Sequence, residues 1–235
     1  LVMHGEDFIN GSYYIKSASV DTTHNWVGQS FTETEKLVVG KSYSSETDMF
    51  ELITKRSQQV DIQFSSGLLA RVTPNSEFRV DAFNQMVSDD SAQPEKLIGG
   101  DFVLNTALMN GEAYFVATKY TSPNTMCVLQ TPLMNVELNG GEYHVKANQK
   151  YTIIYVLKGS LGVFDNQTNK KTMKSEGTMV LIFPSPMKST DIMITEKGIE
   201  PEEYKKLTDD VQVIRSAQPQ IMFALVNGKI VGIKL

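Results

Sequence analysis

The sequence has few of the residues from which most active sites and metal centres are built. Its 235 residues include one cysteine, Cys127, and three histidines, His4, His24 and His144. One cysteine excludes an internal disulfide and a cysteine metal cluster. The histidines show neither HxH nor HExxH spacing, which argues against a histidine metal site. A GxSxG nucleophile motif and a glycine-rich phosphate loop are missing too, so we predict no catalytic, cofactor-binding or metal-binding residue and no enzyme activity.

Positive charge and long apolar runs are also scarce. The formal net charge is -5, which disfavours a general nucleic-acid binder and electrostatic docking on an anionic membrane. The longest apolar runs, such as residues 153–157 and 179–183, are far shorter than the roughly 20 residues that span a bilayer. Hydrophobic residues make up 41% of the chain, which is enough for a core. The length fits one large all-β domain or two small ones.

What the sequence does contain is a series of short β-rich runs, most densely in residues 131–184. Residues 142–147 alternate between an apolar face and a polar face, which predicts a half-buried strand with His144 turned to solvent. Residues 151–157 are apolar on both faces apart from Thr152, which predicts a fully buried strand. Glycine-containing turns are expected at residues 139–141 and 158–160, because glycine tolerates positive φ.

Comparable runs occupy the rest of the chain. Strands are expected near residues 12–20, 49–54, 60–64, 68–72, 77–82, 102–108, 113–119, 126–130 and 192–195. Residues 21–36 are polar and predict a loop with one strand near residues 27–31. Residues 201–211 predict the one helix, with Pro201 at its start and Glu202 and Glu203 in the first turn. Asn227-Gly228 between two apolar runs predicts a β-hairpin.

These patterns predict an all-β, mainly antiparallel fold with one short C-terminal helix. A sandwich and a solenoid-like stack of hairpins are both compatible with them, since similar strand-turn patterns recur at residues 60–67, 134–141 and 221–228. We expect residues 1–36 to form an N-terminal strand and loop extension, and residues 37–190 to form the β domain. Residues 191–235 would then form a helix and hairpin extension that packs on the domain.

Three aromatic residues are candidates for contact with a ligand or partner. Trp26, Tyr13 and Tyr14 could form a platform for a glycan or a protein, while packing in the core is the alternative. Cys127 lies between Met126 and Val128, which favours a buried and inert thiol over a nucleophile.

Several of these runs together resemble the extracytoplasmic domain of the iron-dicitrate sensor (FecR) family. The resemblance covers residues 37–184. Its parts are the strand-turn-strand VDIQFSSGLLARVTPNSEFRV of residues 60–80, GEAYFV of residues 111–116, Thr131-Pro132, LNGGEYHV of residues 138–145, VLKGSLGV of residues 156–163, and Gly177.

The resemblance implies a β-rich body without catalytic residues. FecR-like proteins that regulate transcription carry a cytoplasmic anti-sigma segment and a membrane helix before this domain, and they pass a signal from an outer-membrane transporter to a sigma factor. Stand-alone exported members also exist. The sequence shows neither of the preceding parts and begins at Leu1, so we expect the stand-alone type, located in the periplasm or at the cell surface after removal of a signal peptide.

The leading functional hypothesis is a non-enzymatic bacterial envelope or surface component that acts through contact with a protein partner or through self-association. One alternative is a periplasmic sensor domain of a sigma-factor regulatory system. Another is a module that binds cell-wall glycan or polysaccharide through Trp26 and the nearby tyrosines. A last alternative is a cupin-like metalloprotein, because residues 141–144 are similar to part of a cupin motif. That motif needs two histidines, and only His144 is present here.

Overall fold

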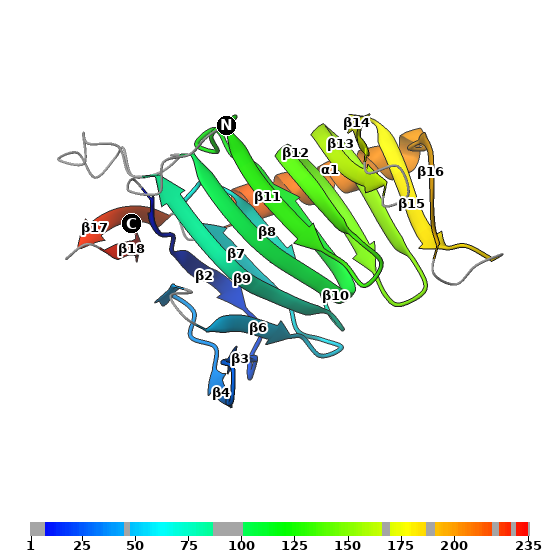
Figure 1. Ribbon diagram of the computed structural model, residues 1–235. Coiled ribbons are helices and arrows are strands. Elements are labelled where there is room, and N and C mark those ends of the chain that lie inside the picture. Colours follow the sequence, from blue (N-terminus) through cyan, green and yellow to red (C-terminus); the bar gives the residue numbers. More distant parts are fainter. Residues whose placement is uncertain are drawn as a thin grey trace.

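The computed structural model describes residues 8–44, 48–86, 101–165, 170–186, 191–217, 221–226 and 229–234 (Figure 1). The strands in chain order are β1 (Phe8–Asn10), β2 (Tyr13–Ala18), β3 (Thr23–Val27), β4 (Thr32–Lys36), β5 (Ser42–Tyr43), β6 (Met49–Ile53), β7 (Val60–Phe64), β8 (Leu69–Val72), β9 (Glu77–Met86), β10 (Phe102–Val116), β11 (Thr125–Gln130), β12 (Asn135–Ala147), β13 (Thr152–Asp165), β14 (Lys170–Ser175), β15 (Thr178–Pro184), β16 (Ile192–Gly198), β17 (Ile221–Val226) and β18 (Lys229–Lys234). The described residues contain a single helix, α1 (Pro201–Ser216), between β16 and β17.

Strands β1 to β16 join into one sheet, and among the described residues β17 pairs only with β18. Neighbouring strands run antiparallel, with the exception of β10 and β11, which are parallel. The predicted all-β, mainly antiparallel class with one C-terminal helix is therefore confirmed. The helix extends beyond the predicted residues 201–211 to Ser216, because Ile214 continues its buried stripe.

Three long strands, β10, β12 and β13, each correspond to two strands in the sequence-based prediction. The turns predicted at residues 139–141 and 158–160 are wrong, because these residues form bends within continuous strands. The strands predicted at residues 102–108 and 113–119 likewise join through a bend at Gly111. Gly111 and Gly159 have φ of 95° and 83°. A residue with positive φ inside a strand forms a bulge that bends the strand without ending its hydrogen bonding.

These bends let the sheet fold over a single main core. Before Gly111, β10 pairs with β9 and β11, and after it with β8 and β12. Aromatic rings from the two halves then meet across the core. Tyr13 of β2 lies 5.1 Å from Phe50 of β6, and Phe64 of β7 lies 5.5 Å from Phe83 of β9, as distances between ring centroids. Packing of two sheet halves in this way corresponds to the sandwich alternative.

Helix α1 covers the outer face of one half, where it contacts β8, β10 and β13 (Figure 1). Strand β13 is consequently buried on both faces between residues 152 and 157, as its apolar sequence predicts. Ile154 and Val156 point into the main core, and Tyr155 and Leu157 lie under the helix. The expectation that His144 faces solvent is wrong, because the same helix covers that face and leaves His144 only 2% exposed.

The N-terminal region differs from the prediction, whereas the C-terminal region agrees with it. The polar segment of residues 21–36 is a hairpin of β3 and β4 in place of the expected loop with one strand. Strands β17 and β18 pair as the predicted C-terminal hairpin, while its turn, Asn227-Gly228, lies outside the described residues. The buried side chain of Phe223 packs this hairpin against Tyr14.

The sheet continues through both predicted domain boundaries, because β4 and β6 both pair with β3, and β16 pairs with β15. The division into residues 1–36, 37–190 and 191–235 stays a prediction. Within the described part of the chain, no helix is long and apolar enough to cross a membrane.

Candidate functional site

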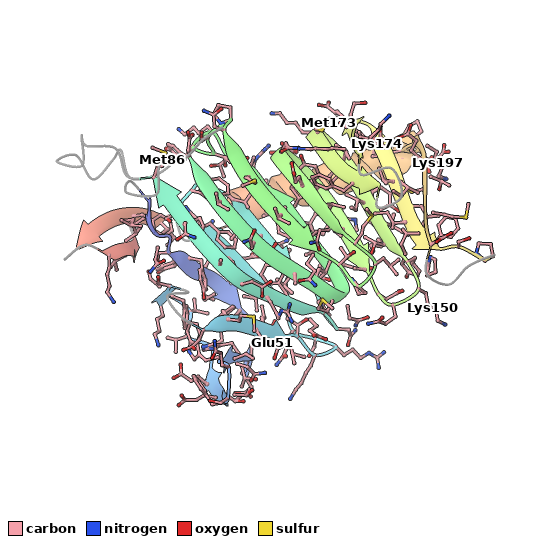
Figure 2. All side chains as sticks on the ribbon, in the orientation of Figure 1. Glu51, Met86, Lys150, Met173, Lys174 and Lys197 are labelled. Carbon is pink, nitrogen blue, oxygen red and sulfur yellow. The ribbon has the colours of Figure 1, made fainter. Side chains whose placement is uncertain are left out.

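A row of polar and aromatic side chains crosses the outer face of the sheet at the place where α1 lies. The sheet register sets each member directly opposite the next on the neighbouring strand. This cross-strand row consists of Ser17, Asp61, Arg71, Tyr114, His144, Tyr155, Met179 and Lys197. Residues on adjacent strands that share a face and a register position contact one another, so the row forms a continuous ladder. Lys197, on β16 at one end of the row, is labelled in Figure 2.

At the other end of the row, Asp61 and Arg71 form a buried ion pair. Arg71 donates from Nε to Asp61 Oδ1 at 2.6 Å and from Nη2 to Asp61 Oδ2 at 2.8 Å. Ser17 donates its hydroxyl to the same carboxylate at 3.0 Å. The side chains of Asp61 and Arg71 are only 6% and 14% exposed. The hydrogen-bonded carboxylate raises the pKa of Arg71, so the guanidinium stays charged.

The centre of the row is a stack of three rings. The His144 ring lies between Tyr114, at 4.2 Å and 12°, and Tyr155, at 5.6 Å and 16°. Its Nε2 is 3.0 Å from Glu112 Oε2, while its buried Nδ1 has no hydrogen-bond partner among the described residues. The hydrogen bond from His144, helped by nearby Lys146, lowers the pKa of Glu112 against the opposing effect of burial.

Helix α1 rests on this row through a short apolar stripe. The stripe consists of Leu207, Val211 and Ile214, at the i, i+4 and i+7 positions that share one helix face. The sheet residues that pack against it are Leu69, Tyr114, Val116, Tyr155 and Leu157. The amphipathic pattern of the helix thus matches an apolar path through the outer face.

Polar contacts align the helix on this path. Tyr114 donates its hydroxyl to Asp210 at 2.9 Å, and Tyr204 donates to the carbonyl oxygen of Leu157 at 2.9 Å. Burial and the Asp210 carboxylate both raise the pKa of Tyr114, so its hydroxyl remains a donor. Near the end of the helix, Arg215 forms an ion pair with Glu142.

This chemistry suits recognition of a helix better than catalysis. The row offers the rings of Tyr114 and Tyr155 and a hydroxyl donor, and the neighbouring Glu142 offers a carboxylate, and α1 uses all of these groups. The described residues contain no cluster of three or more His, Cys, Asp or Glu side chains that could hold a metal ion. Cys127 is buried in the main core, and burial raises the pKa of its thiol to about 12, which keeps it protonated.

The three aromatic residues that the sequence marks as possible contacts do not form one platform. Tyr13 is buried in the main core, and its neighbour Tyr14 points to the opposite face under the C-terminal hairpin. Trp26 is partly buried and packs its ring against His24, with the ring centroids 5.5 Å apart. Of the three, only Trp26 keeps an exposed portion. A contact of these residues with a partner or glycan stays a prediction, and His4 lies outside the described residues.

Sequence reasoning missed the cross-strand row. Alternation correctly placed Glu142, His144 and Lys146 on one face, but period-2 patterns do not show which strands become neighbours. The members of the row are distant in sequence, and they become neighbours only through the pairing of β7, β8, β10 and β12. The amphipathic residues 201–211 were a signal that some sheet face would be covered by a helix.

The geometry defines an all-β protein whose folded sheet carries a helix on one outer face. Residues 50–162 match the model of the family described as FecR protein. This part of the chain, from β6 into β13, matches the FecR family, and the resemblance stated from the sequence is confirmed. No curated protein matches the chain.

Two crystal structures of a proposed anti-sigma factor from Parabacteroides distasonis are similar to this fold. The first, at 1.65 Å resolution, has a TM-score of 0.44 and 13% sequence identity, and the match covers 69% of this chain and 64% of that chain. The second, at 2.50 Å resolution, has a TM-score of 0.46 and 13% identity, and the match covers 80% of this chain and 99% of that chain. The present chain thus matches less than two thirds of the first structure's length.

Proposed function

We propose that this chain is the extracytoplasmic sensor domain of a sigma-factor regulatory system and that it works through protein contacts. The observation that carries this proposal is the FecR match over residues 50–162. The matched region contains most of the strands that build the main core and most of the cross-strand row. The match favours this sensor function over a role in envelope assembly, although both functions act through contact with other proteins.

The surface of the sheet supports a role in protein contact. Within the described chain, β4, β14 and β16 each pair with a neighbour on one side only. Such free edges can accept an extended segment of a partner by strand addition. Figure 2 labels Met173 and Lys174 on β14 and Lys197 on β16, and Lys174 forms an ion pair with Glu196 of β16 at 2.6 Å. Location in the periplasm or at the cell surface, and the lack of enzyme activity, belong to the same proposal.

Deletion of the gene tests this function against the assembly role. A sensor domain is expected to alter the transcripts of a defined set of sigma-dependent genes, and expression of the wild-type chain is expected to restore them. Expression of a chain with Ile154→Asp, which places a charge in the main core, serves as the inactive control. Unchanged transcripts together with increased detergent sensitivity of the cells would contradict the proposal and favour a component of the envelope.

A further inference from the structure

The attachment of α1 to the sheet is narrow for a helix of its length. Only Leu207, Val211 and Ile214 are buried among its 16 residues, and Val213 on the far side is 57% exposed. The N-cap residue, Glu200, makes no side-chain hydrogen bond to the first turn. Apart from the polar contacts of Tyr204, Asp210 and Arg215, few apolar side chains hold the helix, and its N-cap makes no capping bond. These are features of elements that open locally before the rest of a fold.

The sheet face under the helix is largely satisfied without it. Asp61 and Arg71 bind each other, and Glu112 binds His144 and Lys146, so these charged groups take their partners from the sheet. Departure of α1 would remove a partner from the Tyr114 hydroxyl, the Glu142 carboxylate and the carbonyl oxygens of Ala117 and Leu157, and water could then reach them. Leaving a buried charged group without its partner is a large free-energy cost, and the ion pairs within the sheet avoid this cost when the helix leaves.

The family match ends before α1, which agrees with a helix that can leave the sheet. The family match ends at residue 162, within β13, and α1 begins at Pro201. Most sheet residues that bind α1 through their side chains lie inside the matched range, namely Leu69, Tyr114, Val116, Glu142, Tyr155 and Leu157. Met179 on β15 and Lys16, which donates to the carbonyl oxygen of the C-cap residue Ala217, lie outside it. The matched range therefore supplies most of the helix-binding face, and α1 is the segment that occupies it in this structure.

We propose that this helix-binding face, formed by Leu69, Tyr114, Val116, Glu142, Tyr155 and Leu157, binds an amphipathic helix of a partner protein in exchange for α1. The inference rests on the proposed function and names its partner class. The chemistry of the partner is read from α1 itself. The partner helix carries apolar residues at positions i, i+4 and i+7, which correspond to the buried residues of α1. It also carries a carboxylate directly before its i+4 residue, in the place of Asp210, and an arginine four residues after the i+4 residue, in the place of Arg215.

A synthetic peptide of residues 201–216 tests the face directly, with the full-length chain as receptor. Val211 is fully buried, so Val211→Asp in the receptor is expected to release its own helix. The labelled peptide should then bind this receptor at least about tenfold more tightly than the wild-type chain, in which the tethered helix competes at high effective concentration. A peptide that itself carries Val211→Asp is the matched control and should not bind. A folded Val211→Asp receptor that fails to bind the peptide would overturn the proposal.

If the Val211→Asp receptor does not fold, hydrogen exchange of the wild-type chain tests the proposal instead. The amides of residues 201–216 should exchange at least about tenfold faster than those of β10 and β12, because α1 opens while the sheet stays closed. Equal protection of α1 and these strands would overturn the proposal. Adding Tyr114→Phe to a folded receptor should weaken peptide binding about tenfold, through loss of the bond to Asp210. These measurements use purified protein, so they succeed or fail independently of any effect on transcription.

Discussion

The rings of Tyr114 and His144 lie parallel on neighbouring strands, with their centroids 4.2 Å apart. The Tyr114 hydroxyl donates a hydrogen bond to Asp210 of α1, and the His144 ring is hydrogen-bonded to Glu112 of the sheet. The stack thus connects the helix with the charged network of the outer face. Contacts of this kind between buried polar groups and aromatic rings fix one alignment of the two layers.

Removal of the arginine of the row should be costly. Arg71→Ala leaves the carboxylate of Asp61 buried without its partner, and a loss of about 3–5 kcal/mol in the free energy of unfolding is expected. Urea denaturation measures this loss. The double variant Asp61→Asn with Arg71→Met removes both charges and should recover most of it. A loss below about 1 kcal/mol for Arg71→Ala would mean that Asp61 is paired or hydrated by other groups.

The bend in β13 can be tested with two glycines of similar backbone conformation. Gly159 has φ of 83° and Gly177 has φ of 80°, so alanine at either position is strained. A Cβ at Gly159 would lie 2.6 Å from the carbonyl oxygen of Gly140, whereas one at Gly177 meets nothing within 4 Å. We expect Gly159→Ala to lower the free energy of unfolding by about 3 kcal/mol and Gly177→Ala by about 1–2 kcal/mol. Equal losses in thermal denaturation would show that the close approach at Gly159 is relieved.

A buried histidine near the N-terminal hairpin should make the fold sensitive to acid. His24 is stacked on Phe50 with both ring nitrogens unbonded within the described structure, and burial lowers its pKa from 6.5 in spite of Glu35 at 3.6 Å. The unfolded chain therefore takes up a proton at this residue first. Stability should fall as the pH drops below about 6.5, by up to about 1.4 kcal/mol per pH unit, until the folded form is protonated as well.

His24→Phe provides the control for this dependence, because it keeps the ring contact and removes the titration. Lys41 and Tyr43 also lie near the imidazole and are unchanged in the variant. Urea denaturation between pH 5 and pH 7 should give a flatter profile for His24→Phe than for the wild type, on a scale of about 1 kcal/mol per pH unit. Identical profiles would assign the acid sensitivity to other groups.

The central strand of the fold provides the last test. Ile154 is fully buried in the main core, and Ile154→Asp should unfold the domain because it places an unpaired charge there. Circular dichroism and thermal denaturation report the outcome. Lys150→Asp, in the exposed turn before the strand, is the control for the introduced charge and should change stability by less than about 0.5 kcal/mol. Wild-type stability of Ile154→Asp would show that this face of β13 is not part of the core.

Much of the secondary structure could be predicted, because patterns among residues close in sequence indicate strands and helices. Alternation located β7, β9 and the second half of β12, and Pro201 with Glu202 and Glu203 located the start of α1. The predicted turns at Gly141 and Gly159 were wrong for one shared reason. Glycine in a strand permits a bulge as readily as a turn, and only pairing with neighbouring strands decides between them.

The sequence by itself determined the all-β class, the alternation of faces in strands such as β7, β9 and the second half of β12, and the presence of one helix, because side-chain periodicity is a local property. The FecR resemblance was likewise visible in the strand and glycine pattern. Only the tertiary structure decided that Asp61, Arg71, Tyr114 and His144 form one row and that α1 covers it. These residues lie far apart in sequence and become neighbours through strand register and helix docking, which depend on the whole chain at once.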